Sequence, residues 1–76
     1  MKSITYYNAS WCKPCRIIKP VLAELGVPIK SVDVETQPTE GVTSLPTLVL
    51  MQDGVEVERI TGVSDAVIAR LRKWAK

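Results

Sequence analysis

The sequence predicts an α/β fold: a four-stranded mixed β-sheet flanked by helices, built from a strand-helix-strand unit followed by a strand-strand-helix unit. In the first half, a run of alternating apolar and polar residues precedes apolar residues at helical spacing and a second short apolar run. In the second half, two strand-like runs flank a turn and precede another helical pattern. At 76 residues, 46% of them hydrophobic and 24% charged, the chain is expected to form one domain over residues 1–76.

Two segments of the first half are predicted to be neighbouring parallel strands. Ile4 and Tyr6 alternate with their neighbours, which indicates a strand over residues 2–7. Val32 and Val34 mark the second strand. Because strands joined so briefly through a helix form a right-handed crossover, the two strands should run parallel.

A helix is predicted between these strands, starting at Cys12. Gly26 and then Pro28 end it, as a C-terminal cap followed by a residue that breaks helices. Its apolar residues recur at helical spacing and are expected to form a core face: Ile17, Ile18, Val21, Leu22 and Leu25.

The second half is predicted to be a β-hairpin followed by a helix. Residues 47–51 and 55–60 are strand-like, and the Gln-Asp-Gly sequence at 52–54 is typical of the turn between antiparallel strands. Ser64 is suited to cap the final helix. The residues expected on the core face of that helix are Val67, Ile68, Leu71 and Trp74.

Composition argues against several classes of function. A net charge of +2 is too small to indicate nucleic-acid binding, and the basic residues near the C-terminus are explained by the dipole of the final helix. No run approaches the ~18 apolar residues of a membrane span, and the N-terminus does not resemble a signal peptide. We therefore expect the protein in the reducing cytoplasm. We also expect it to be a monomer.

The only two cysteines lie in the sequence Trp11-Cys12-Lys13-Pro14-Cys15. A permanent structural disulfide is not expected in a reducing compartment, where a cysteine pair more often serves catalysis or metal binding. Structural zinc takes four Cys or His ligands, and the chain has no histidine, so no metal site is assigned. Redox chemistry is the main interpretation, and a zinc shared by a dimer and an inert pair remain as alternatives.

Cys12 is predicted to be the attacking nucleophile, from its expected exposure and thiolate character. It lies where a strand leads into a helix, so unpaired N–H groups, the helix dipole and the charge of Lys13 all favour the thiolate. Cys15 follows at i+3, within reach of a disulfide, and is predicted to be the resolving thiol. Pro14 should stiffen the first helical turn. Trp11 is expected either half exposed beside the sulfurs or in a packing role.

At these residues the sequence resembles the thioredoxin family. Trp11-Cys12-x-Pro14-Cys15 matches the active-site motif of the family, with Lys13 in place of its glycine. Further matches follow in the family's order over nearly the whole chain: Pro20, Leu45-Pro46-Thr47, Asp53-Gly54 and Gly62. The resemblance implies the thioredoxin-like fold.

The resemblance also implies a substrate-binding loop opposite the cysteines. Leu45, Pro46 and Thr47 match the loop that carries the family's cis proline, so a cis peptide bond is expected before Pro46. The backbone of Leu45 would then pair with an extended substrate segment. Gly62 is counted with these residues as substrate-binding.

Two departures from thioredoxins concern the proton chemistry and the size. Tyr6 stands where thioredoxins carry a buried aspartate, so the usual proton acceptor for Cys15 is missing and water or another group must serve. Between Pro38 and Pro46 the chain is about one helical turn shorter than a thioredoxin, which is similar to glutaredoxins.

Residues 61–65 resemble the signature that holds glutathione in glutaredoxins. Thr61 stands in place of the first of its two glycines, and Asp65 would contact glutathione. The alternative is an ordinary helix start, with Ser64 as the cap and Asp65 in the first turn.

The resemblance implies a thiol-disulfide oxidoreductase that reduces protein disulfides through its Cys-Lys-Pro-Cys dithiol. Cys12 would attack the substrate disulfide, and Cys15 would then displace the reduced substrate. No metal or organic cofactor is expected. A thioredoxin reductase is the expected recycling partner, and a glutaredoxin recycled by glutathione is the alternative. Other classes that remain are a non-catalytic binding module and a dimeric metal-binding protein.

Overall fold

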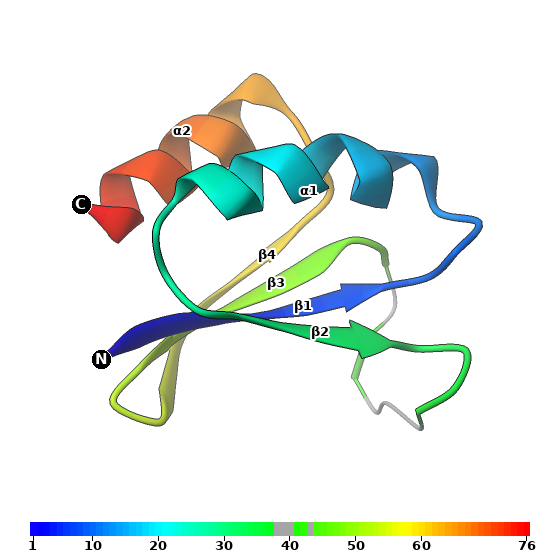
Figure 1. Ribbon diagram of the computed structural model, residues 1–76, viewed down its shortest axis with the longest axis horizontal. Helices are drawn as coiled ribbons and strands as arrows, with labels where there is room; N and C mark the ends of the chain where they lie inside the picture. The colour runs from blue at the N-terminus through cyan, green and yellow to red at the C-terminus, as the bar shows by residue number, and fades with distance from the viewer. Residues whose placement is uncertain (38–40, 43) are drawn as a thin grey trace.

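The elements of the fold follow the predicted order (Figure 1). The computed structural model describes residues 1–37, 41–42 and 44–76, so part of the shortened segment before Pro46 lies outside the described residues. The elements are β1 (Lys2–Asn8), α1 (Lys13–Glu24), β2 (Ile29–Asp33), β3 (Thr47–Gln52), β4 (Val55–Thr61) and α2 (Asp65–Ala75).

The sheet is mixed, as predicted, with the strand order β2-β1-β3-β4. β1 runs parallel to β2 and antiparallel to β3, and β3 pairs antiparallel with β4. Val34, predicted to lie in the second strand, is instead just beyond β2, although its N–H still donates to the carbonyl of Asn8 at 3.0 Å. In the hairpin turn, Asp53 and Gly54 have φ values of 54° and 83°, the left-handed conformation that tight two-residue hairpins require.

Both helices cover the same face of the sheet (Figure 1). Residues of β1 and β3 such as Ile4 and Leu50 share one core with Ile18 of α1 and Leu71 of α2, and each of these four side chains is 0% exposed. The buried sheet residues of this core belong to the two central strands, and Ile29 of β2 and Ile60 of β4 pack against them while partly exposed. Within the described ranges, neither helix has the length and apolar character needed to cross a membrane.

The prediction that Ile17 belongs to the core was wrong. α1 buries Cys15, Ile18 and Leu22, a stripe along one side of the helix. Ile17 is rotated by about 100° from Ile18 around the helix axis and is 59% exposed. An exposed apolar side chain therefore lies on α1, five residues after the first cysteine.

The ends of the helices follow the predicted caps. Gly26, just past the end of α1, has a φ of 74°, which a glycine adopts without steric cost. The Ser64 hydroxyl accepts a hydrogen bond from the N–H of Val67 at 3.2 Å and so caps α2.

Candidate active site around the cysteine pair

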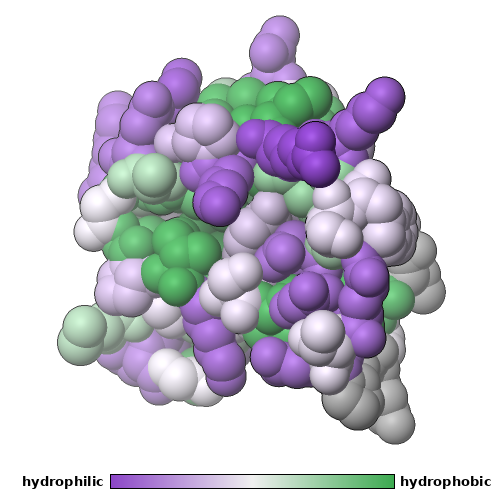
Figure 2. Space-filling model, turned by 45° about the vertical axis from the view of Figure 1, so that its right-hand side comes forward, coloured by the Kyte–Doolittle hydropathy of each residue, from purple (hydrophilic) through white to green (hydrophobic). Residues whose placement is uncertain are grey.

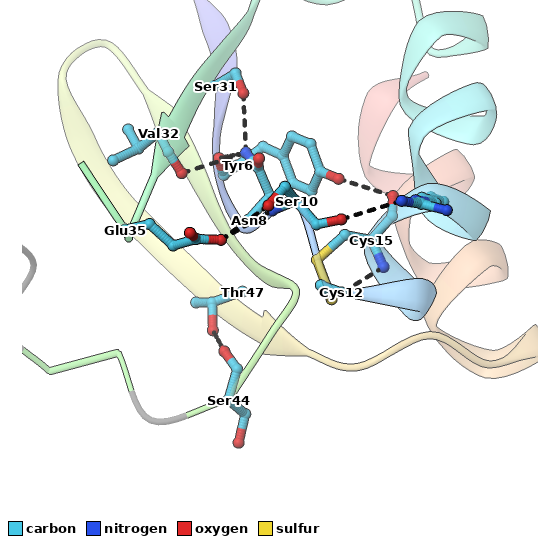
Figure 3. The surroundings of a disulfide bond; sticks show 11 residues. Tyr6, Asn8, Ser10, Cys12, Cys15, Ser31, Val32, Glu35, Ser44 and Thr47 are labelled. Atoms are coloured by element: carbon cyan, nitrogen blue, oxygen red, sulfur yellow. Dashed lines mark hydrogen bonds between the residues drawn. A yellow bond between two sulfur atoms is a disulfide. The ribbon is translucent and has the colours of Figure 1, made fainter. Parts of the chain in front are cut away.

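The two cysteines lie where β1 leads into α1, and they are joined by a disulfide (Figure 3). Cys12 is the N-cap of α1, and its Sγ accepts a hydrogen bond from the N–H of Cys15 at 3.2 Å. The Cα atoms of the pair are 5.3 Å apart. The predicted position of Cys12, beside the free N–H groups and the positive end of the helix dipole, is confirmed.

The expected difference in exposure between the cysteines is not present in this oxidised pair. Cys12 is 3% exposed and Cys15 is 2% exposed. The two residues nevertheless line different hollows. Cys12 borders a large groove, and Cys15 borders a smaller pocket behind it. Their surroundings, rather than their exposed areas, distinguish them.

The groove beside Cys12 has a volume of about 750 Å³ and a largely apolar wall. Trp11 is 67% exposed and is therefore a surface residue, not part of the core. Across the groove from the start of α1 lies the segment that precedes β3. The described lining residues are Trp11, Cys12, Lys13, Pro14, Val34, Val42, Ser44 and Leu45.

Three of these lining residues, Val34, Val42 and Ser44, were not assigned to the site from the sequence. Val34 was assigned to a strand, and only its place beyond the end of β2 puts it at the groove. Val42 and Ser44 carry no periodic pattern. The one available signal was their proximity in sequence to Leu45 and Pro46.

The loop opposite the cysteines contains a cis peptide bond between Leu45 and Pro46, as predicted. Leu45 lines the groove, whereas Pro46 and Thr47 are buried behind it. The Thr47 hydroxyl donates to the carbonyl of Ser44 at 2.6 Å, and the N–H of Gly62 donates to the carbonyl of Pro46 at 3.0 Å. Thus only Leu45 of the predicted substrate-binding loop reaches the groove, and Gly62 supports the loop from behind.

Asp65 belongs to the start of α2 and not to the described wall of the groove. It is an exposed residue in the first turn of α2, next to the Ser64 cap. It is not among the described residues that line the groove. The geometry therefore fits the interpretation of residues 61–65 as a helix start.

Tyr6 occupies the position of the missing aspartate. Its side chain is 6% exposed, and its hydroxyl donates to the carbonyl oxygen of Cys15 at 2.7 Å (Figure 3). Burial raises the pKa of Tyr6 above its usual value. Tyr6 is therefore a neutral hydrogen-bond donor near neutral pH, not a proton acceptor.

The side of the molecule in Figure 2 has hydrophobic surface in several separate areas. Hydrophilic side chains stand between these areas and project from the surface. On the face shown, the apolar surface is therefore divided by polar groups and does not form one continuous patch.

Comparisons with known proteins agree on one family. The family model described as Thioredoxin matches residues 2–75. The thioredoxin of Chlamydia caviae is 42% identical over 68 residues, which cover 78% of this chain and 67% of that protein. The thioredoxin of Listeria monocytogenes is 39% identical over 69 residues, with the same two coverages of 78% and 67%.

Solved structures give the same result. Fasciola hepatica thioredoxin has a TM-score of 0.81 at 30% identity, with 99% of this chain and 81% of that chain covered. Oxidised mitochondrial thioredoxin 3 from Saccharomyces cerevisiae has a TM-score of 0.79 at 30% identity, with coverages of 95% and 76%. With a Cys-x-x-Cys pair at the start of α1, the chain belongs to the thioredoxin family and is a protein disulfide oxidoreductase.

Proposed function

We propose that the protein reduces disulfides of other proteins through the dithiol of Cys12 and Cys15. The observation that carries this proposal is the position of Cys12 in the wall of an apolar groove that is open to solvent. An extended substrate segment would lie in the groove and pair with the backbone of Leu45, which holds its disulfide near Cys12.

In the first step, the thiolate of Cys12 attacks one sulfur of the substrate disulfide. A bond forms between Cys12 and that sulfur, and the other substrate sulfur leaves as a thiolate. The N–H of Cys15, the dipole of α1 and the charge of Lys13 stabilise the anionic form of Cys12. In the second step, the thiolate of Cys15 attacks Cys12 and releases the second substrate sulfur, so two electrons pass to the substrate.

The reduced pair must then be regenerated, and we propose that a thioredoxin reductase does this. Trp11 and Pro14 border the groove beside Cys12 as parts of the thioredoxin motif, which supports this partner. Glutathione remains the second candidate because residues 61–65 resemble the signature that holds glutathione in glutaredoxins. Asp65 is in the first turn of α2, next to the Ser64 cap, and is not among the described residues that line the groove, which favours the first candidate.

A recycling assay tests this choice. The protein is supplied with a disulfide substrate and NADPH, together with either thioredoxin reductase or glutathione and its reductase, and NADPH loss is followed. We expect rapid turnover in the first system and poor turnover in the second. Efficient turnover with glutathione that is lost in Asp65→Ala, by an amount that shrinks with added salt, would instead identify a glutaredoxin activity.

We further propose that residues 1–76 act as one domain and as a monomer in the cytoplasm. The shared core of Ile4, Ile18, Leu50 and Leu71 joins both halves of the chain, which supports one domain. Light scattering at micromolar concentration should give the mass of one chain. A dimeric mass that requires zinc would support the metal-binding alternative.

A further inference from the structure

A second hollow lies behind the cysteine pair, and we call it the rear pocket. It has a volume of about 190 Å³ and is lined by Tyr6, Asn8, Ala9, Ser10, Cys15, Arg16, Lys19 and Ser31. Cys15 is in its wall and Cys12 is not. Since a water molecule takes about 30 Å³ of liquid and needs two to four polar partners, the rear pocket can hold several waters.

Hydrogen bonds fix the wall of the rear pocket (Figure 3). The Asn8 side-chain amide donates to Ser31 Oγ at 2.9 Å and to the carbonyl of Tyr6 at 3.1 Å, so it ties β1 to β2. The Tyr6 hydroxyl donates to the carbonyl of Cys15 at 2.7 Å. The phenol thereby attaches the first turn of α1 to β1, with Cys15 against the pocket.

The charged groups around Cys15 are mainly cationic. Arg16 and Lys19 line the rear pocket, and Lys13 lines the groove on the other side. Among the described residues, neither wall contains a carboxylate. In the described part of the chain, the Glu35 carboxylate contacts this region through Ser10, whose N–H and hydroxyl donate to its Oε1 at 3.3 and 3.0 Å.

We propose that Cys15 loses its proton to water in the rear pocket, on the side away from the groove. Tyr6 is the positioning residue that holds Cys15 against this pocket. This inference rests on the proposed reduction of disulfides. The Cys15 thiol transfers its proton to a water molecule, and its thiolate attacks Cys12. The bond from Cys12 to the substrate sulfur then breaks, the substrate leaves as a thiolate, and the Cys12–Cys15 disulfide forms.

This route explains how a member of the family can work without the buried aspartate. Water solvates the Cys15 thiolate, and the nearby cations Arg16 and Lys19 favour the anion. Tyr6 cannot accept the proton, because its own hydroxyl is neutral and donates to the Cys15 carbonyl. Its expected contribution is to the position of Cys15 and not to proton transfer itself.

A stopped-flow reaction with excess dithiobis-nitrobenzoate under single-turnover conditions separates the two steps. Attack by Cys12 releases one coloured aryl thiolate, and resolution by Cys15 releases the second. The concentration dependence of the first phase identifies it as the bimolecular step. Loss of the first phase in the unchanged protein would refute the proposed function, whereas the inference about the rear pocket concerns the second phase alone.

Ser31→Val exchanges a hydroxyl in the wall of the rear pocket for two methyl groups, which makes the surroundings of Cys15 less polar and displaces about one water. We expect the first phase to be unchanged and the pH midpoint of the second phase to move upward. At a pH below the midpoint, each unit of increase in the pKa of Cys15 lowers its thiolate fraction about tenfold. The more basic thiolate is also about threefold more reactive, so the rate of the second phase should fall by roughly three- to fourfold per unit. Ser3→Val, which also adds a branched apolar side chain to a strand but lies outside the rear pocket, is the matched control and should change neither phase.

Three further variants make the outcome decisive. Tyr6→Phe should slow the second phase and leave the first intact, because it removes only the hydroxyl that holds Cys15. Lys19→Met, at an exposed position, should raise the pH midpoint of the second phase even if Ser31→Val does not fold. Glu35→Gln should leave that midpoint unchanged. A midpoint shift in Glu35→Gln, or an unchanged second phase in correctly folded Ser31→Val and Lys19→Met, would overturn the proposal.

Discussion

The N–H of Cys15 donates to the Sγ of Cys12 across 3.2 Å, so the second cysteine of the motif directly supports the sulfur of the first. The contact exists because Cys12 is the N-cap of α1, where the first N–H groups of a helix have no backbone acceptor. An anionic sulfur would accept this hydrogen bond more strongly than a neutral thiol. The two cysteines are therefore unequal although both are buried.

The first prediction concerns their separate roles. Cys12→Ser should abolish the reduction of insulin disulfides, measured by the turbidity of the released chain. Cys15→Ser should attack once and remain joined to its substrate as a mixed disulfide, visible on a non-reducing gel. Alkylation of the reduced protein at neutral pH should label Cys12 first, and labelling of Cys15 first would reverse the assignment.

The second prediction concerns Lys13 and the reduction potential. Thioredoxins and glutaredoxins span about −270 to −200 mV, and we expect this protein to lie within or slightly above that range because Lys13 favours the reduced thiolate. Lys13→Gly should lower the potential by roughly 10 to 20 mV, the size expected for an exposed charge interaction. Equilibration with a series of glutathione buffers measures the reduction potential of both proteins. A potential well below that of thioredoxins in the unchanged protein would show that Lys13 has no such effect.

The third prediction concerns the start of α2. Ser64→Ala removes the acceptor for the Val67 N–H and should lower the free energy of unfolding by about 1 kcal/mol. Asp65→Ala should cost roughly 0.3 to 1 kcal/mol through the helix dipole and leave recycling by thioredoxin reductase intact. Urea unfolding measures both. Unchanged stability in Asp65→Ala, together with lost reactivity toward glutathione, would instead assign Asp65 to ligand binding.

The fourth prediction concerns Tyr6 and alkaline pH. Burial raises the pKa of Tyr6 in the folded state, so the unfolded chain loses this proton first as the pH rises. Its contribution to stability is complete below about pH 10 and is lost as the pH rises through the folded-state pKa. Tyr6→Phe should be about 1 kcal/mol less stable at neutral pH through the lost hydrogen bond.

Above about pH 10, the stability of Tyr6→Phe should fall less steeply than that of the unchanged protein. Urea unfolding at neutral and alkaline pH provides the measurement. Parallel pH profiles for the two proteins would show that Tyr6 titrates alike in the folded and unfolded states.

Local sequence was sufficient to determine the order of elements, the hairpin turn, both helix ends and the location of the cysteine pair. Each depends on residues that are close along the chain. Gly54 allows the left-handed turn, and Ser64 caps a helix that begins at the next residue. The cis peptide bond before Pro46 was predictable from the family motif, although no local rule requires it.

Only the tertiary structure decided which side chains face which surroundings. Ile17 and Ile18 are adjacent and chemically identical, yet one is 59% and the other 0% exposed, because the sheet covers only one side of α1. Val42 and Ser44 became groove residues because β3 brings their segment opposite Cys12. The contact from Tyr6 to Cys15 likewise joins a strand to a helix, and such pairing through space leaves no periodic signal in the sequence.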